Sequence, residues 1–262
     1  MLFPIGDDNQ GRLTTPIVVY TIIAINLAVF LLLQQAGQTP QGERFTYGYS
    51  VIPHEITTGT DLTAPVVVPG APPTIDRRTG RREQPVIPEA PGPNPIYLTL
   101  LTSMFMHGGW LHLLGNMLYL WIFGDNIEDN FGHFRFLLFY LICGLVAAFA
   151  QIFADPTSII PSLGASGAIA GVLGAYLIMF PRNRVRNLVF FGFFFTTIEL
   201  PAVIVLGFWI VIQIVQQYMS SFEFAQSGGV AYMAHIGGFV SGLLLCFIFR
   251  SNRQRREPFY YQ

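Results

Sequence analysis

Long apolar runs separated by polar loops dominate the pattern of this chain. A run of roughly 18 or more apolar residues can cross a hydrocarbon core about 30 Å thick, because an α-helix rises about 1.5 Å per residue. Six segments of this kind can be drawn, at about residues 16–35, 107–124, 134–153, 164–181, 199–219 and 230–249. The pattern therefore predicts an all-α polytopic membrane protein with six transmembrane helices.

A further apolar stretch, residues 188–197, is too short to cross a bilayer. We expect it either at the inner membrane interface or as an extension of the fifth transmembrane helix.

The composition indicates that lipid is the main solvent. Of the 262 residues, 52% are hydrophobic and 11% are charged, whereas soluble domains carry about 25% charged residues. The two cysteines, Cys143 and Cys246, lie inside apolar runs. We interpret them as small packing residues rather than as a disulfide framework.

A proline-rich segment, here called the insert, separates the first two predicted helices. Residues 38–96 contain 11 of the 18 prolines. This composition favours an extended, mobile and aqueous segment. We therefore divide the chain into an N-terminus with the first transmembrane helix (1–37), the insert (38–96), a helical core (97–250) and a basic tail (251–262).

The arginines predict the orientation in the membrane, because short cytoplasmic loops collect positive charge. Nine arginines fall on one side of the predicted bundle: Arg12, Arg135, Arg182, Arg184, Arg186, Arg250, Arg253, Arg255 and Arg256. The short loops on the other side carry only Asp155 and Glu223. We expect the protein to lie in the plasma or inner membrane, with both termini in the cytoplasm. The insert would then lie outside, with its cluster of Arg77, Arg78, Arg81 and Arg82.

A few polar residues lie within the apolar segments, where they are costly and therefore informative. They are His107, His112, Asn116, Ser166 and His235. At about 1.5 Å per residue, Ser166 lies about 24 Å above Arg182 and His235 about 22 Å above Arg250. The Gly238-x-x-x-Gly242 pattern allows helices to approach closely. Ser166 and His235 could therefore reach hydrogen-bond distance.

Each of these features also has a simpler explanation. A Gly-x-Ser-Gly sequence in an apolar run usually serves packing, and a buried histidine can bind haem or a metal ion, relay protons or contact a carbonyl. A proton-linked transporter or a haem protein is therefore an alternative. The occurrence of a hydroxyl, an imidazole and an amide at one depth on parallel segments favours a catalytic site.

Three motifs in this order resemble those of the rhomboid intramembrane serine proteases. The first is His107-x4-His112-x3-Asn116, the second is Gly164-Ala-Ser166-Gly167, and the third is Ala234-His235-Ile-Gly-Gly238-x-x-x-Gly242. The resemblance covers about residues 98–250 and implies a rhomboid-like bundle. It also implies substrates that are transmembrane proteins in the lipid bilayer, with no cofactor, metal ion or nucleic acid.

The same resemblance implies roles for these residues. Ser166 would be the nucleophile and His235 the base of a dyad. The backbone N–H of Ser166, with His112 and Asn116, would bind the oxyanion. His107, Gly164, Gly167, Gly238, Gly242 and Glu128 would support the site. The fifth predicted helix would form a lateral gate by analogy.

Three positions depart from the family pattern. Glu128 and Gly132 fit a Glu-x-Arg-x-Gly motif, but Asn130 replaces the arginine. Leu98-Thr99 replaces a Trp-Arg pair, and Ala170 stands where many members place an aromatic ring that stacks on the histidine. These departures leave open an alternative, a catalytically silent rhomboid-like protein that binds transmembrane clients.

The insert either recruits such clients or is a passive tether, and its composition predicts a tether. All the candidate catalytic residues follow it in the sequence. Replacement of residues 57–88 by a short Gly/Ser linker should therefore preserve labelling of Ser166 by a fluorophosphonate and cleavage of a generic reporter. Loss of labelling in a folded, shortened chain would contradict this prediction.

Overall fold

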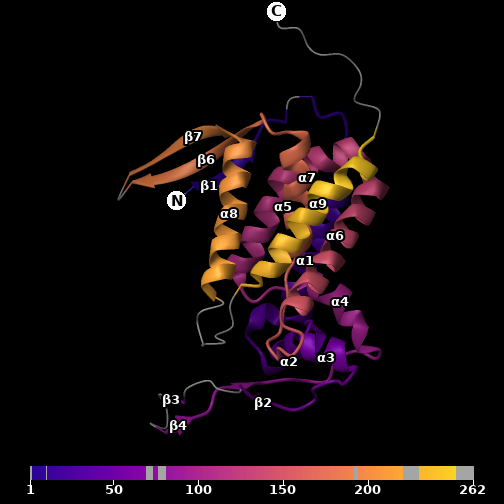
Figure 1. Ribbon diagram of the computed structural model, residues 1–262, viewed down its shortest axis with the longest axis vertical. Coiled ribbons are helices and arrows are strands. Elements are labelled where there is room, and N and C mark those ends of the chain that lie inside the picture. The colour runs from indigo at the N-terminus through magenta and orange to yellow at the C-terminus, as the bar shows by residue number, and fades with distance from the viewer. Residues whose placement is uncertain are drawn as a thin grey trace, which may run out of the picture.

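The computed structural model describes residues 2–9, 11–68, 73–75, 81–191, 194–220 and 230–251, and this part of the chain is mostly helical. Six helices form a bundle (Figure 1). They are α1 (Ile17–Ala28), α5 (Trp110–Phe131), α6 (His133–Ala154), α7 (Ser166–Met179), α8 (Ala202–Ser220) and α9 (Tyr232–Phe249). Each lies within or overlaps one of the six predicted apolar segments.

Three of these helices are long and apolar enough to cross a membrane by length and composition. They are α6, α8 and α9. Helix α1 continues into a π-helical turn, Val29–Leu33, and α7 has only 14 residues. The crossing of the membrane by all six segments stays a prediction.

The turn between α5 and α6 explains one glycine of the sequence motif. Gly132 alone separates the two helices and has a φ of +80°. Residues with a Cβ rarely adopt this conformation. The backbone N–H of Gly132 donates to the carbonyl of Glu128, and its own carbonyl accepts from Phe136 N–H. The chain thus reverses between two long helices within one residue.

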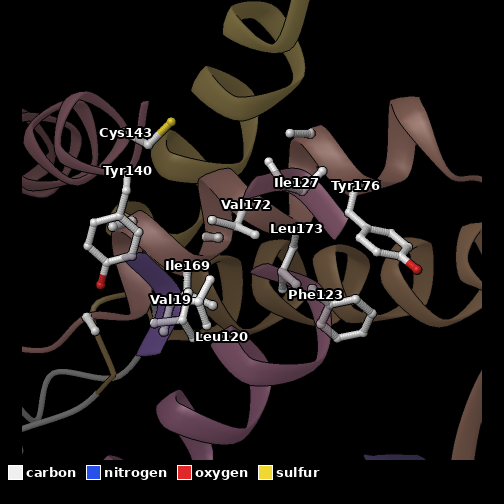
Figure 2. Close-up of a cluster of buried hydrophobic side chains, with 14 of the residues drawn as sticks. Val19, Leu120, Phe123, Ile127, Tyr140, Cys143, Ile169, Val172, Leu173 and Tyr176 are labelled. Carbon is white, nitrogen blue, oxygen red and sulfur yellow. The ribbon is translucent and has the colours of Figure 1, made fainter. Parts of the chain in front are cut away.

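The core lies between α1, α5, α6 and α7 (Figure 2). Phe123 of α5 and Tyr176 of α7 meet edge to ring at 5.0 Å between centroids. Val19 of α1 and Cys143 of α6 are completely buried in the same cluster. Cys143 and Cys246 are both free and buried, which confirms that they are packing residues.

A three-stranded sheet lies beside one end of the bundle, here called the sheet end. Its strands are β1 (Leu2–Asp7), β6 (Arg184–Phe191) and β7 (Phe194–Pro201), in the order β1-β6-β7. Figure 1 shows β6 and β7 projecting beside α8. The prediction of an all-α fold is therefore wrong at this point, and residues 188–197 do not extend the fifth helix. Their aromatic and β-branched residues favour strands over a helix.

The insert begins at the opposite end of the bundle with two helices, α2 (Pro40–Tyr49) and α3 (Pro53–Thr58) (Figure 1). We expected an extended segment here, and the structure differs. Thr39 caps α2 through Gly42 N–H, and a proline occupies the first turn of each helix, where it costs no hydrogen bond. Arg77 and Arg78 of the predicted arginine cluster lie outside the described residues.

The rest of the chain near this end forms short elements. They are η2 (Gln35–Gly37), β2 (Val66–Val67), β3 (Thr74–Ile75), β4 (Arg82–Glu83), β5 (Val86–Ile87), η3 (Ile96–Leu98), α4 (Thr99–Thr102) and η4 (Ser103–Phe105). Strand β2 pairs with β5, and β3 pairs with β4. The described residues between 66 and 87 thus form two small two-stranded sheets.

The carboxylate of Glu128 holds the start of α1 at the sheet end. Glu128 is completely buried, and its two oxygens accept hydrogen bonds from the backbone N–H groups of Val18 (2.9 Å) and Val19 (2.8 Å). They thus cap the start of α1, where backbone N–H groups have no partner in the helix. The His133 ring lies 2.5 Å from the same carboxylate. Glu128 is therefore a structural brace although Asn130 replaces the expected arginine.

A second group of contacts ties the first residues of the chain to the same end. Arg12 forms an ion pair with Asp125 of α5. Asp7 of β1 accepts hydrogen bonds from Asn126 of α5 (2.8 Å) and Tyr176 of α7. Burial raises the pKa of the Asp7 carboxyl to about 7. Of the basic tail, residues 252–262 lie outside the described residues, as do residues 221–229 after α8, which include Glu223.

The brace at Glu128 predicts a stability effect. Glu128→Ala should lower the free energy of unfolding by roughly 2 to 4 kcal/mol, because it removes a charged cap and leaves the buried N–H of Val19 and the part-buried N–H of Val18 without partners. Thermal unfolding in detergent would measure it. Asp129→Ala is a matched control, since Asp129 accepts from Leu13 and Thr14 at an exposed position. Equal losses in the two variants would contradict the brace.

Candidate active site

The side chains of Ser166 and His235 meet between α7 and α9. The Ser166 Oγ lies 2.7 Å from His235 Nε2, although the two residues are 69 positions apart. Ser166 is the first residue of α7, and His235 lies in the first turn of α9. The two residues expected at one depth are thus within hydrogen-bond distance.

Glycines make this approach possible. A Cβ on Gly238 would collide with the carbonyl oxygen of Gly167, and one on Gly242 with the carbonyl oxygen of Gly171. The backbones of α7 and α9 are therefore closer than any residue with a side chain would allow at these positions. A Cβ on Gly167 would itself lie 2.6 Å from Cβ of Ala147 in α6, so α6 closes the third side.

The segment before Ser166 is held in a defined conformation. Gly164 has a φ of +129°, and its N–H donates to the carbonyl of Ser103 at 2.9 Å. Two residues earlier, Ser162 and Val51 of the insert exchange backbone hydrogen bonds of 2.7 and 3.0 Å. Because Ser166 begins a helix, its own N–H has no partner within that helix. This N–H is available to an oxyanion beside the hydroxyl.

His112 and Asn116 lie one turn apart on α5 and face the same region. The N–H of Gly108 donates to His112 Nδ1 at 3.3 Å, which leaves Nε2 to carry the proton of a neutral ring. A Cβ on Gly164 would lie 2.8 Å from that Nε2 and 3.6 Å from Ser166 Oγ. The amide nitrogen of Asn116 is buried without a hydrogen-bond partner among the described residues. His112 thus offers an N–H donor near Ser166, and Asn116 offers another in the wall of the cavity that Ser166 also lines.

His107 lies behind His112 and is 1% exposed. The side-chain amide of Gln34 donates a hydrogen bond to the His107 carbonyl and accepts one from the His107 N–H, both at 2.9 Å. The rings of His107 and His112 meet edge to face at 5.0 Å. His107 therefore packs against the neighbouring ring. Glu128 lies sixteen residues after His112 along α5, about 24 Å away, so any support that it gives to the site passes through the fold.

An open cavity of about 1410 Å³ gives solvent access to these groups. Its walls include His112, Asn116, Ser166 and His235, together with Thr46 and Tyr47 of the insert helix α2. Water can thus reach the Ser166 hydroxyl from the end of the bundle where the insert lies. The part of the chain that the structure describes contains no group of three or more histidine, cysteine or acidic side chains placed to hold a metal ion.

A family model described as the Rhomboid domain matches residues 95–252. This chain belongs to the rhomboid family. The match covers more than half of the chain and includes every residue that the sequence motifs singled out. The resemblance deduced from those motifs is confirmed, and the chain is a rhomboid-family membrane protein with several apolar helices.

Named relatives are similar over this rhomboid region. The "Rhomboid protease GluP" of Bacillus subtilis is 38% identical over 143 residues, which are 55% of this chain and 24% of GluP. The "RHOMBOID-like protein 1" of Arabidopsis thaliana is 33% identical over 57% of this chain and 34% of its own length. The "Putative rhomboid protease YdcA" of B. subtilis is 27% identical over 60% of this chain and 69% of its own length. This chain thus spans only about a quarter to a third of the first two relatives.

Two residues around the rhomboid site were missed by the sequence reasoning, and both come from α8. The Gln213 Oε1 lies 2.6 Å from His235 Nδ1, and the Trp209 ring lies 5.8 Å from the His235 ring. Ala170 is completely buried and places no ring on His235. The sequence signal that could have revealed them is a polar residue, Gln213, within an apolar segment and four residues after Trp209.

The geometry around Ser166 predicts partial losses for the two side-chain donors. Asn116→Ala and His112→Ala should each lower the cleavage rate by roughly 10- to 1000-fold, because the other donors of the oxyanion site remain. Rates of reporter cleavage and of fluorophosphonate labelling would measure the effect. Complete loss of labelling together with a lowered melting temperature would instead make these side chains structural.

Proposed function

We propose that this chain is an intramembrane serine endopeptidase that cleaves transmembrane segments of membrane proteins by a dyad of Ser166 and His235. The observation that supports it best is the 2.7 Å contact between Ser166 Oγ and His235 Nε2. A serine hydroxyl becomes a useful nucleophile when a neighbouring base accepts its proton.

The reaction would proceed in two halves. Ser166 Oγ attacks the scissile carbonyl while His235 Nε2 takes its proton, and the tetrahedral oxyanion forms beside the N–H of Ser166 and the donors of His112 and Asn116. His235 then gives the proton to the leaving amine as the C–N bond breaks. A water molecule from the cavity attacks the acyl-serine with His235 again as base, which releases the second product and restores the hydroxyl.

The proposed topology follows the arginine distribution. Six segments cross the plasma or inner membrane, both termini are cytoplasmic, and the insert lies outside. The sheet end then faces the cytoplasm, where Arg12, Arg184 and Arg186 lie. The cavity opens toward the outer side, so the substrate is a transmembrane helix that unwinds near its outer end. Residues that weaken a helix there would favour cleavage, since a helical peptide bond is not presented for attack.

The alternative is a silent rhomboid-like protein that binds transmembrane clients. The departures at Asn130 and Ala170 motivated it. Two sets of contacts argue against it. The hydrogen bonds of Glu128 supply a brace without an arginine at position 130, and the contacts of His235 with α8 support its ring without an aromatic residue at position 170. Binding of a client without cleavage would favour this alternative.

Ser166→Ala should abolish cleavage of a reporter that carries an unstable transmembrane segment, while the melting temperature stays near that of the parent. The N-terminal sequence of the product should place the cut near the outer end of that segment. Cleavage by the alanine variant at even a few per cent of the parent rate, in preparations free of other proteases, would contradict the assignment.

A further inference from the structure

Helix α8 supplies the polar contact to the second nitrogen of His235. We propose that Gln213 is a positioning residue that orients the His235 imidazole and fixes its tautomer, with the Trp209 ring as a steric support. This inference rests on the proposed function, and it adds a third member to a site that the sequence predicted as a dyad.

The contacts of the His235 ring determine which of its nitrogens can act as a base. Gln213 Oε1 lies 2.6 Å from His235 Nδ1, and Ser166 Oγ lies 2.7 Å from Nε2, so both ring nitrogens are occupied. When Nδ1–H donates to the Gln213 carbonyl oxygen, Nε2 carries the lone pair that can accept the Ser166 proton. A ring with the opposite tautomer would present an N–H to Ser166 and could not act as its base.

The burial of Gln213 is otherwise difficult to explain. The other buried residues of α8 are Ala202, Val205 and Leu206, all in its first turns. Gln213 is 8% exposed, and a buried amide is costly without a hydrogen bond. Within residues 207–220 it is the one buried side chain of α8, and its carbonyl oxygen is directed at His235.

Trp209 lies one turn before Gln213, on the same face of α8. Its ring is 5.8 Å from that of His235 and 6.0 Å from Phe239, with interplanar angles of 38° and 33°. The aromatic residue expected four positions after the serine is Ala170. Ring support from α7 is thus absent at this position, and α8 provides an aromatic wall instead.

A displacement of this half of α8 would remove both contacts at once. The position of α8 therefore determines whether the His235 ring is oriented to act as a base. Because Gln213 is neutral, it stabilises the imidazolium less than an aspartate would, and we expect a smaller effect than the roughly 10⁴-fold loss seen when the orienting aspartate of a serine protease triad is replaced.

The test compares Gln213→Leu, Gln213→Glu and the matched control Gln216→Leu, which changes an exposed glutamine on the same helix. Fluorophosphonate labelling of Ser166 and the kcat and KM of reporter cleavage are measured for each folded chain. Gln213→Leu should lower the labelling rate and kcat by about 10- to 100-fold with KM unchanged. Gln213→Glu keeps an acceptor oxygen and should remain within a few-fold of the parent, and the control should be unchanged.

The outcomes separate this inference from the proposed function. A parent that neither labels nor cleaves would contradict the proposed function itself. A parent that labels while Gln213→Leu labels within two-fold of it would overturn only the role of Gln213. Equal losses in the leucine and glutamate variants would also overturn it, because the acceptor would then be irrelevant. If Gln213→Leu does not fold, Gln213→Met is measured in its place under the same criteria.

Discussion

The close approach of α7 and α9 is the constraint on which the site depends. Gly238 and Gly242 face carbonyl oxygens of α7 at distances that leave no room for a Cβ. Without hydrophobic driving force between helices in lipid, such packing relies on van der Waals contact and short side chains. The Ser166 and His235 side chains sit at the end of this seam, so the same contact that stabilises the bundle sets their separation.

Other elements position the groups of the site that the contact between α7 and α9 does not hold. Gly164 and the Ser162 pairing with Val51 of the insert hold the segment that leads into α7. Helix α5 brings the N–H donors, and its far end is tied to α1 by the Glu128 carboxylate. Helix α8 contacts the other side of the His235 ring. Four helices and the insert therefore contribute contacts to the site, although the proposed nucleophile and base come from α7 and α9 alone.

Sequence reasoning recovered the parts of this architecture that depend on regular spacing. Equal depth of Ser166 and His235 follows from the constant rise of a helix, and the close approach of their helices follows from the Gly238-x-x-x-Gly242 pattern. It missed Gln213 and Trp209, because their relevance depends on how α8 is rotated and packed. It also missed the β6 and β7 hairpin and the two insert helices, where apolar aromatics and prolines were interpreted by composition rather than by local capping and pairing.

Activation of the Ser166 hydroxyl by His235 can be measured by mass spectrometry of the folded chain after reaction with a fluorophosphonate. If His235 is the base, a single adduct forms on the peptide that contains Ser166, and none forms at the same reaction time in a folded His235→Ala variant. An adduct on another residue, or equal labelling of the His235→Ala chain, would contradict it.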